Sequence, residues 1–294
     1  ANKIWNAFRL VNGWKVDDKI IQPEASAAAV KWMDEIVKKA TAEVDSNFRK
    51  FRISEALMNL YKLFWDEFSS WYLESIKPEY EKPIDRATYE ATLKIFDKLL
   101  RLIHPFMPFI TEELWQLIAE RKDGESIMIS KMPDLKKYNK ELVEKFEVAK
   151  EVVTAVRSIR KDKEIPLKET LELFIKAEEK DYDTGFLAVI SKLCNLAVIS
   201  FVDEKQPGAT SFMVGTNEYY IPLGDKLDSE KELVKLNTEL EYLKGFLISV
   251  MKKLDNERFV NNAPPAVIEL ERKKQSDALS KITAIEERIK ELSK

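Results

Sequence analysis

The residues best suited to chemistry in this sequence are mostly basic, and they fall into three groups. The first group is the polar face of the opening helical stretch, opposite Trp5 and Phe8: Asn2, Lys3, Asn6 and Arg9. The second group ends a helical segment: Arg157, Arg160, Lys161 and Lys163. The third group flanks a proline-containing turn and includes one aromatic residue: Lys252, Lys253, Arg258, Phe259, Arg272, Lys273 and Lys274. Arginine and lysine in such groups suit contacts with phosphate.

The last two groups also have a simpler interpretation. Cations at the end of a helix interact favourably with its dipole, which would account for residues 157–163. Charges on a coiled coil are commonly a solvated face. Phe259, which we expect the turn to expose, either stacks on an unpaired base or closes the end of the coiled coil against Val267. The residues alone leave these alternatives open.

Patterns for catalysis or metal binding are missing from the sequence. It contains no glycine-rich nucleotide loop, no HExxH and no nucleophile elbow. The one histidine, His104, sits in a proline-rich helix junction without a patterned nucleophile or acid, so we interpret it as structural. The one cysteine, Cys194, lies in an apolar context and excludes a disulfide framework or a cysteine zinc site within one chain. We therefore expect no catalytic residue and no metal site, and a reducing compartment.

Composition bounds the class of protein. A chain of 294 residues is long enough for two or three domains, and 34% charged residues with only seven glycines favour helices. The formal net charge of −3 means that a surface for nucleic acid has to be local. No apolar run approaches the length of a membrane span, and no signal peptide is visible. Because Ala1 already begins a helical pattern, we expect a piece of a longer protein.

Helices must position the first group. Apolar spacing predicts helices over residues 1–12, 24–48, 52–76, 85–103 and about 108–121. The stretch over residues 52–74 is apolar on nearly all sides, so we expect it in the middle of a bundle. Lys77-Pro78 ends it, because the residue before a proline is disfavoured in helical geometry. These segments predict an all-α bundle.

The other two groups belong to different elements. A helix over residues 141–161 is followed by a change of period that predicts strands over 171–176 and 197–202, with a helix over 185–195 between them. This crossover should make the two strands parallel neighbours. A hairpin is expected around Gly215, over residues 211–214 and 218–221.

The last 70 or so residues carry a heptad seam, in two arms separated by residues 255–265. The first arm places these residues on the seam: Leu233, Leu236, Leu240, Leu243, Leu247, Val250 and Leu254. The second arm continues it with Ala278, Ile282, Ile285, Ile289 and Leu292, while Glu271 and Gln275 are poor seam residues near the bend. This predicts an antiparallel coiled-coil hairpin about 33 Å long. We therefore expect three domains, over residues 1–139, 140–224 and 225–294.

Several of these segments resemble bacterial-type valyl-tRNA synthetases over nearly the whole chain. The bundle phrases are NFRKFRISEALMNLYKLFWDEFSSWYLE and LIHPFMPFITEELW. The C-terminal phrases are RSIRKDKEIPLK, VGTNEYYIPL and, most specific of all, FVNNAPPAVIELERKK. Isoleucyl- and leucyl-tRNA synthetases carry relatives of the second bundle phrase. Ser70 is a departure, since the family often has cysteine there, and we expect it to be harmless.

The resemblance implies a mainly α fold: an anticodon-binding helical bundle, a small α/β module and an antiparallel coiled-coil arm. It implies a parent enzyme that ligates valine to tRNA(Val) with ATP and Mg, whose catalytic and editing domains lie upstream. The chain itself should be inactive and hold no cofactor. Its bundle should meet the anticodon through the first group, and its arm and module should meet the tRNA elsewhere through the other two. We expect a cytoplasmic monomer that binds neither membrane nor DNA.

Two alternatives remain. The chain could be a helical or coiled-coil scaffold without an RNA role, which RNA-dependent retention at moderate salt would test. It could also be the same region of an isoleucyl- or leucyl-tRNA synthetase, which a comparison of cognate tRNAs would decide.

Overall fold

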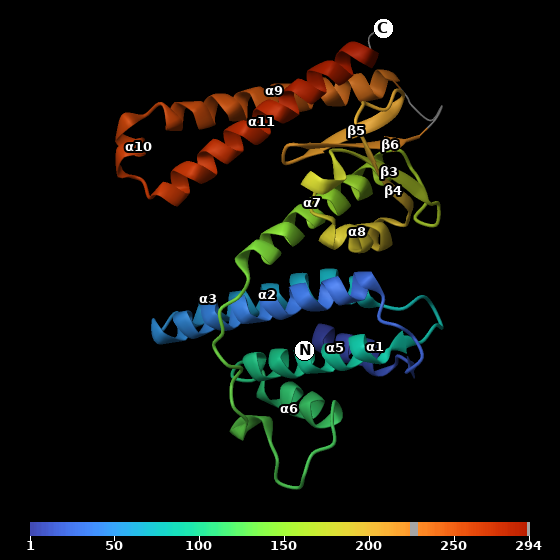
Figure 1. The fold of residues 1–294 in the computed structure, drawn as a ribbon. Coiled ribbons are helices and arrows are strands. Elements are labelled where there is room, and N and C mark those ends of the chain that lie inside the picture. The colour runs from blue at the N-terminus through green and yellow to red at the C-terminus, as the bar shows by residue number, and fades with distance from the viewer. Residues whose placement is uncertain (224–228, 293–294) are drawn as a thin grey trace. The chain divides into compact units, whose positions relative to one another are not determined.

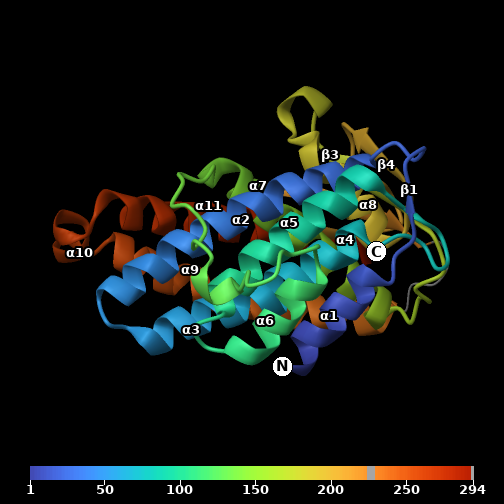
Figure 2. The same cartoon turned by 90° about the horizontal axis from the view of Figure 1, so that it is seen from below.

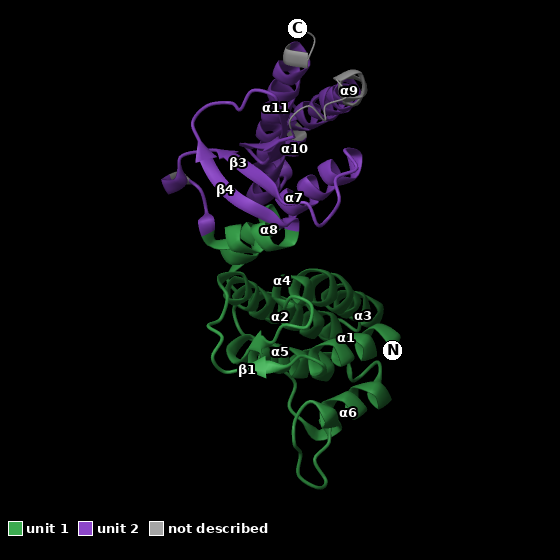
Figure 3. Ribbon diagram, turned by 90° about the vertical axis from the view of Figure 1, so that its right-hand side faces the viewer, with its two compact units in different colours: residues 1–149, 185–193 green, residues 150–184, 194–294 purple. Residues whose placement is uncertain are grey.

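The computed structural model describes residues 1–223 and 229–292, without the side chains of Asp181, Arg258 and residues 229–235 and 291–292. The chain divides into two compact units (Figure 3). Unit 1 comprises residues 1–149 and 185–193, and unit 2 comprises residues 150–184 and 194–294. The predicted division into three domains stays a prediction, and its boundary between residues 224 and 225 lies outside the described residues.

Unit 1 is a helical bundle, as the spacing of apolar residues predicts. Its helices are α1 (Asn2–Asn12), α2 (Glu24–Arg49), α3 (Ile53–Lys62), η1 (Leu63–Tyr72), α4 (Leu73–Ile76), α5 (Arg86–Ile103), α6 (Pro108–Leu117) and η2 (Ile127–Ile129). Two-residue strands, β1 (Val16–Asp17) and β2 (Ile84–Asp85), pair in parallel. The Asp85 carboxylate accepts a hydrogen bond from the Thr88 amide at 2.8 Å and thereby caps α5.

The predicted central helix is continuous from α3 to α4, but only its second half is central. Phe64, Phe68 and Tyr72 of η1 are buried, and the Phe68 ring lies 5.5 Å from Phe96 of α5. This part is π-helical, and the Ser70 hydroxyl donates to the Trp65 carbonyl oxygen at 2.9 Å. The first half disagrees with the prediction. Ala56 and Leu60 of α3 are buried, but its other apolar side chains are between 47% and 53% exposed: Ile53, Leu57, Met58 and Tyr61. Trp65, near the start of η1, is 42% exposed.

Unit 2 contains a four-stranded sheet with the order β4-β3-β6-β5. Its strands are β3 (Leu171–Lys176), β4 (Leu196–Val202), β5 (Ala209–Val214) and β6 (Asn217–Pro222). As predicted, β3 and β4 are parallel and β5 and β6 form a hairpin. The short helices η3 (Glu179–Asp181) and η4 (Thr184–Phe186) and the helix α8 (Leu187–Cys194) connect β3 to β4, and residues 185–193 of this connection belong to unit 1. Helix α7 (Lys140–Asp162) begins in unit 1 and ends in unit 2.

The C-terminal arm is the predicted antiparallel coiled-coil hairpin (Figure 1). It consists of α9 (Ser229–Leu254), a short α10 (Glu257–Asn262) at the turn, and α11 (Pro265–Leu292). Leu240 and Leu243 of α9 form a buried cluster with Ile282 and Ile285 of α11. The direction of the arms follows from ion pairs, because Lys244 meets Glu286 whereas Lys253 meets Glu271. Among the helices of the described ranges, none has both the length and the apolar character needed to cross a membrane.

Candidate nucleic-acid interface

The polar face of α1 lies at the surface of unit 1. Asn2, Asn6 and Arg9 are exposed and Lys3 is half-buried. The opposite side of α1 packs into the bundle next to η1 and α6 (Figure 2). Trp5, which the sequence places on the apolar side, is 38% exposed. The predicted group is therefore accessible, and it has an aromatic neighbour.

Two stacked rings accompany this face. Tyr61 and Trp65 lie 5.4 Å apart between ring centroids with an interplanar angle of 14°, and the Lys3 ammonium nitrogen is 3.8 Å from the Trp65 centroid. We call these three residues the aromatic shelf. They line a cavity of about 470 Å³ that Asn2 also borders. Exposed rings beside a cation can stack unpaired bases and attract their phosphates.

Arg9 opens onto a different cavity of about 860 Å³. Three further cations border it: Lys15, Lys77 and Lys82. Tyr80, in the loop between α4 and β2, is 90% exposed at its edge. The polar face of α1 thus leads from the aromatic shelf to a basic cavity, an arrangement suited to a base at one end and a phosphate backbone at the other.

The second predicted group is not a uniform contact surface. Arg160 is 3% exposed, so its prediction as a tRNA contact is corrected. Its guanidinium donates to the carbonyl oxygens of Pro166 at 3.0 Å, Glu169 at 2.8 Å, Cys194 at 2.8 Å and Asn195 at 3.3 Å. Arg160 therefore links the end of α7 to the segments that precede β3 and β4. Arg157 and Lys161 are exposed, and they remain predicted contacts.

The single cysteine is a buried residue of unit 2 with low reactivity. Cys194 is buried beside Arg160, and burial raises the pKa of its thiol to about 12, although Arg157 and Arg160 act in the opposite direction. A thiol with that pKa stays protonated near neutral pH and is a poor nucleophile or metal ligand. The described residues hold no cluster of histidine, cysteine, aspartate or glutamate that could bind a metal ion. His104 contacts the Thr111 hydroxyl at 2.7 Å, at the junction of α5 and α6.

At the tip of the arm, a buried carboxylate engages part of the third group. Glu271 is 5% exposed and accepts from the Lys274 ammonium at 2.7 Å, with Lys253 at 3.6 Å. The hydrogen bond from Lys274 and the charge of Lys253 lower the pKa of the Glu271 carboxyl. Glu271, although a poor residue for the seam, is thus paired with two lysines. Of the remaining cations, these are exposed and face the solvent: Lys252, Arg272 and Lys273.

The aromatic residue predicted for this tip is not exposed by the turn. Phe259 is half-buried within α10, so the prediction of its exposure is corrected; its predicted contact with tRNA stays a prediction. The side chain of Arg258 lies outside the described residues. Sequence reasoning missed Tyr242 of α9, which is 71% exposed, as well as Tyr61 and Trp65 of the aromatic shelf. An aromatic residue off the leucine seam was the available signal for Tyr242.

Two family profiles match the chain. The profile described as the anticodon-binding domain of tRNA ligase matches residues 30–175. The profile described as the valyl tRNA synthetase tRNA binding arm matches residues 228–293, which contain α9 to α11.

Known proteins that match nearly the whole of this chain agree with these profiles. The valine–tRNA ligase of Parabacteroides distasonis is 60% identical over 293 residues, covering 100% of this chain and 33% of the relative. That of Phocaeicola vulgatus is 56% identical with the same coverage. That of Enterococcus faecalis is 35% identical over 308 residues, covering 99% of this chain and 34% of the relative. The chain spans about a third of the length of these relatives.

Proposed function

The chain belongs to the valyl-tRNA synthetase family, and we propose that it is the tRNA-binding C-terminal part of an enzyme that ligates valine to tRNA(Val) with ATP and Mg. The observation that carries this proposal is the match of the tRNA binding arm profile to the antiparallel hairpin of α9 to α11. That profile favours the valine enzyme over the isoleucine and leucine relatives. It also argues against a scaffold without an RNA role.

Within this function, the parts of the chain have different tasks. The bundle, residues 1–139, recognises the anticodon region through the aromatic shelf and the exposed Asn2, Asn6 and Arg9. The module, residues 140–224, and the arm, residues 225–294, bind tRNA backbone through exposed cations. Stacking supplies contact with unpaired bases, whereas cations supply salt-dependent affinity. We further propose a cytoplasmic monomer.

The test is tRNA binding across a salt series. The chain should bind tRNA(Val) more tightly than tRNA(Ile) or a DNA hairpin of equal length, with an affinity that falls as salt rises because phosphate contacts release counterions. Equal affinity for all three nucleic acids would contradict recognition of tRNA(Val). Failure to bind any of them at moderate salt would favour the scaffold alternative.

We predict that the chain alone shows no valine-dependent pyrophosphate exchange and no aminoacylation. The sequence lacks the family's nucleotide-binding motifs, and no patterned nucleophile or base replaces them. The measurement is exchange of labelled pyrophosphate by the purified chain, with a full-length relative as the positive control. Pyrophosphate exchange above background would contradict the proposal that this part of the enzyme binds tRNA and carries no catalytic site.

We predict that Arg9→Ala weakens binding of tRNA(Val) by roughly 1–3 kcal/mol, as expected for loss of a base or charged contact. Asn6→Ala on the same exposed face should have a smaller effect, because a neutral amide makes weaker hydrogen bonds. Affinity is measured by fluorescence anisotropy of labelled tRNA(Val). If both variants bind as the unmodified chain does, the polar face of α1 is only solvated.

At the arm tip, we expect charge reversal of exposed lysines to weaken tRNA binding without lowering stability, unlike charge reversal of a lysine that pairs with Glu271. Lys252→Glu with Lys273→Glu should lower tRNA affinity and flatten the salt dependence by about one unit of slope for each lost phosphate contact. Because both side chains are exposed, melting should not change. Lys253→Glu is a poorer test, since it would place a second carboxylate beside buried Glu271 and destabilise the hairpin.

A matched control for the tip is Lys290→Glu, an exposed lysine at the other end of α11. It should leave the salt slope nearly unchanged. Equal losses for the tip and control variants would mean that general charge, and not a phosphate-binding tip, sets the affinity.

A further inference from the structure

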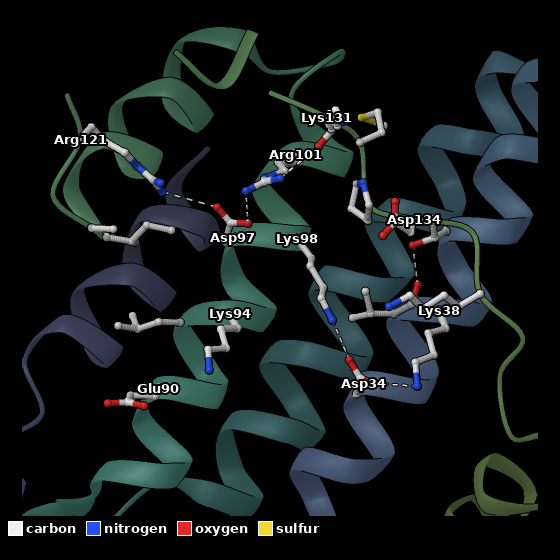
Figure 4. A pocket seen from close by; sticks show the side chains of 18 residues that line it. Asp34, Lys38, Glu90, Lys94, Asp97, Lys98, Arg101, Arg121, Lys131 and Asp134 are labelled. Atoms are coloured by element: carbon white, nitrogen blue, oxygen red, sulfur yellow. Dashed lines mark hydrogen bonds and ion pairs between the residues drawn. The ribbon is translucent and has the colours of Figure 1, made fainter. Parts of the chain in front are cut away.

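Unit 1 contains a third cavity that shares no residue with the two beside α1. Its volume is about 920 Å³. It lies among α2, α5, the end of α6 and the linker that follows η2 (Figure 4). None of the predicted site residues lines it. We call it the cationic cleft, because its charged side chains are predominantly basic.

At one end of the cleft, charges are balanced. Asp34 of α2 meets the ammonium groups of Lys38 at 2.8 Å and Lys98 at 2.7 Å. Lys38 also meets Glu35 at 2.7 Å. Two carboxylates therefore match two cations here, and this end offers little attraction to a further anion.

The other end of the cleft carries surplus positive charge. Asp97 of α5 meets Arg101 at 2.8 Å and Arg121 at 3.5 Å, and it also accepts from the Trp115 indole nitrogen at 2.7 Å. Figure 4 shows the two guanidinium groups approaching Asp97 from opposite sides. One carboxylate is thus shared by two cations, which leaves a net positive charge.

Two lysines add to this surplus, and Glu90, which also lines the cleft and meets Arg86 at 3.6 Å, offsets part of it. Lys94 lies about one turn before Asp97 on α5, and Lys131 adjoins Arg101, whose guanidinium donates to the Lys131 carbonyl oxygen at 3.1 Å. Both lysines are exposed, and neither ammonium group has an ion-pair or hydrogen-bond partner within the described parts of the chain. Like charges gathered around one cavity repel each other, and an anion bound among them would relieve that repulsion.

Much of the remaining wall is apolar, although Asp134 and Lys136 of the linker also line it. Leu93 of α5, Ile118 after α6, and Met132 and Pro133 of the linker line the cleft. The linker is held at both ends of this stretch, by the bond from Arg101 and by the Asn139 amide, which donates to Glu35 at 2.6 Å. The cleft thus has a fixed wall that a planar apolar group can contact, next to a cationic end.

We propose that the cationic cleft binds a nucleotide, with phosphate at Arg101, Arg121, Lys94 and Lys131 and the base against the apolar wall. The guanidinium and ammonium groups supply the donors that phosphate requires. A volume of about 920 Å³ falls within the range of small-ligand sites. The same chemistry is offered by a free mononucleotide and by a nucleotide within an RNA strand, so the experiment has to separate these sources.

The experiment uses the whole 294-residue chain and two probes, AMP and a hexauridylate with a 5′-hydroxyl end, in calorimetric titrations at low salt. The test variant is Lys94→Glu with Lys131→Glu, whose exposed side chains can change without disturbing the core. The control variant is Lys31→Glu with Lys50→Glu, which makes the same charge change at exposed positions of unit 1 outside the cleft. Melting curves establish that all three proteins fold equally.

We expect the unmodified chain to bind AMP, the hexauridylate or both. The test variant should bind the same probe about 10-fold more weakly, whereas the dissociation constant of the control variant should stay within about twofold of that of the unmodified chain. Cleft-dependent binding of AMP supports a free nucleotide. Cleft-dependent binding of the hexauridylate without AMP supports a nucleotide within RNA. Binding of neither probe, or equal losses in the two variants, overturns the proposal. Binding of tRNA(Val) by the test variant is measured separately, so failure here is distinct from failure of the proposed function.

Discussion

Replacing Arg160 by methionine is expected to lower the local free energy of unfolding of the unit 2 sheet by about 3–4 kcal/mol. The guanidinium is 3% exposed and donates to four backbone carbonyl oxygens, from residues between α7 and β3 and at the end of α8. Methionine fills similar space but donates nothing. The carbonyl oxygen of buried Cys194 then loses its guanidinium donor. Those of Pro166, Glu169 and Asn195 keep only neutral donors, at 3.1, 3.3 and 3.2 Å. A buried acceptor without a partner costs more than the bond itself contributes.

The measurement is hydrogen exchange of the β3 and β4 amides, because a chain with two units need not unfold in one transition. A loss of about 3 kcal/mol corresponds to faster exchange by roughly a hundredfold. Lys161→Met is the matched control, since Lys161 is the exposed neighbour of Arg160. Equal protection in the two variants would show that the bonds of Arg160 are dispensable.

Arg160 also shows where sequence reasoning fails. Periodicity predicts α7 and its basic end correctly, because an apolar stripe at helical spacing is a local property. Whether a guanidinium at that end faces solvent or carbonyl oxygens depends on where residues 166–169 and 194–195 are placed by the tertiary fold. The helix-end and phosphate interpretations both assume an exposed side chain. A buried cation satisfied by backbone leaves no pattern in the sequence.

The coiled coil and the sheet were predictable for the same reason that α7 was. The leucine seam of α9 specifies a partner helix, and the crossover from β3 to β4 specifies parallel strands. Glu271 is instructive, since the heptad pattern places this carboxylate on the seam, and the structure buries it there. The sequence could not say that Lys253 and Lys274 surround it and are therefore less available to RNA.

The two rings of the aromatic shelf were missed because of an inference about burial. A helix that is apolar on nearly all sides is expected to be buried on all sides. In the structure, most of η1 fulfils that expectation, but one side of α3 is open and so is Trp65 near the start of η1, with Tyr61 50% and Trp65 42% exposed. Exposed apolar side chains that lie together beside the polar face of α1 are typical of a binding surface. Neither helix shows this when its sequence is considered alone.

Tyr61→Ala with Trp65→Ala is therefore expected to weaken binding of tRNA(Val) by roughly 1–3 kcal/mol for each base that stacks on the shelf. The loss should be similar at low and high salt, because stacking releases few counterions, and this distinguishes the shelf from the arm tip. Ile53→Ala with Met58→Ala is the matched control, since both residues are exposed on α3 and neither lines the shelf cavity. The single variant Trp65→Phe should retain most of the affinity for tRNA(Val), because it keeps an aromatic ring at this position. If the control pair loses as much affinity as the shelf pair, the exposed side of α3 acts through general apolar contact; if neither pair loses affinity, the bases of the anticodon region do not stack there.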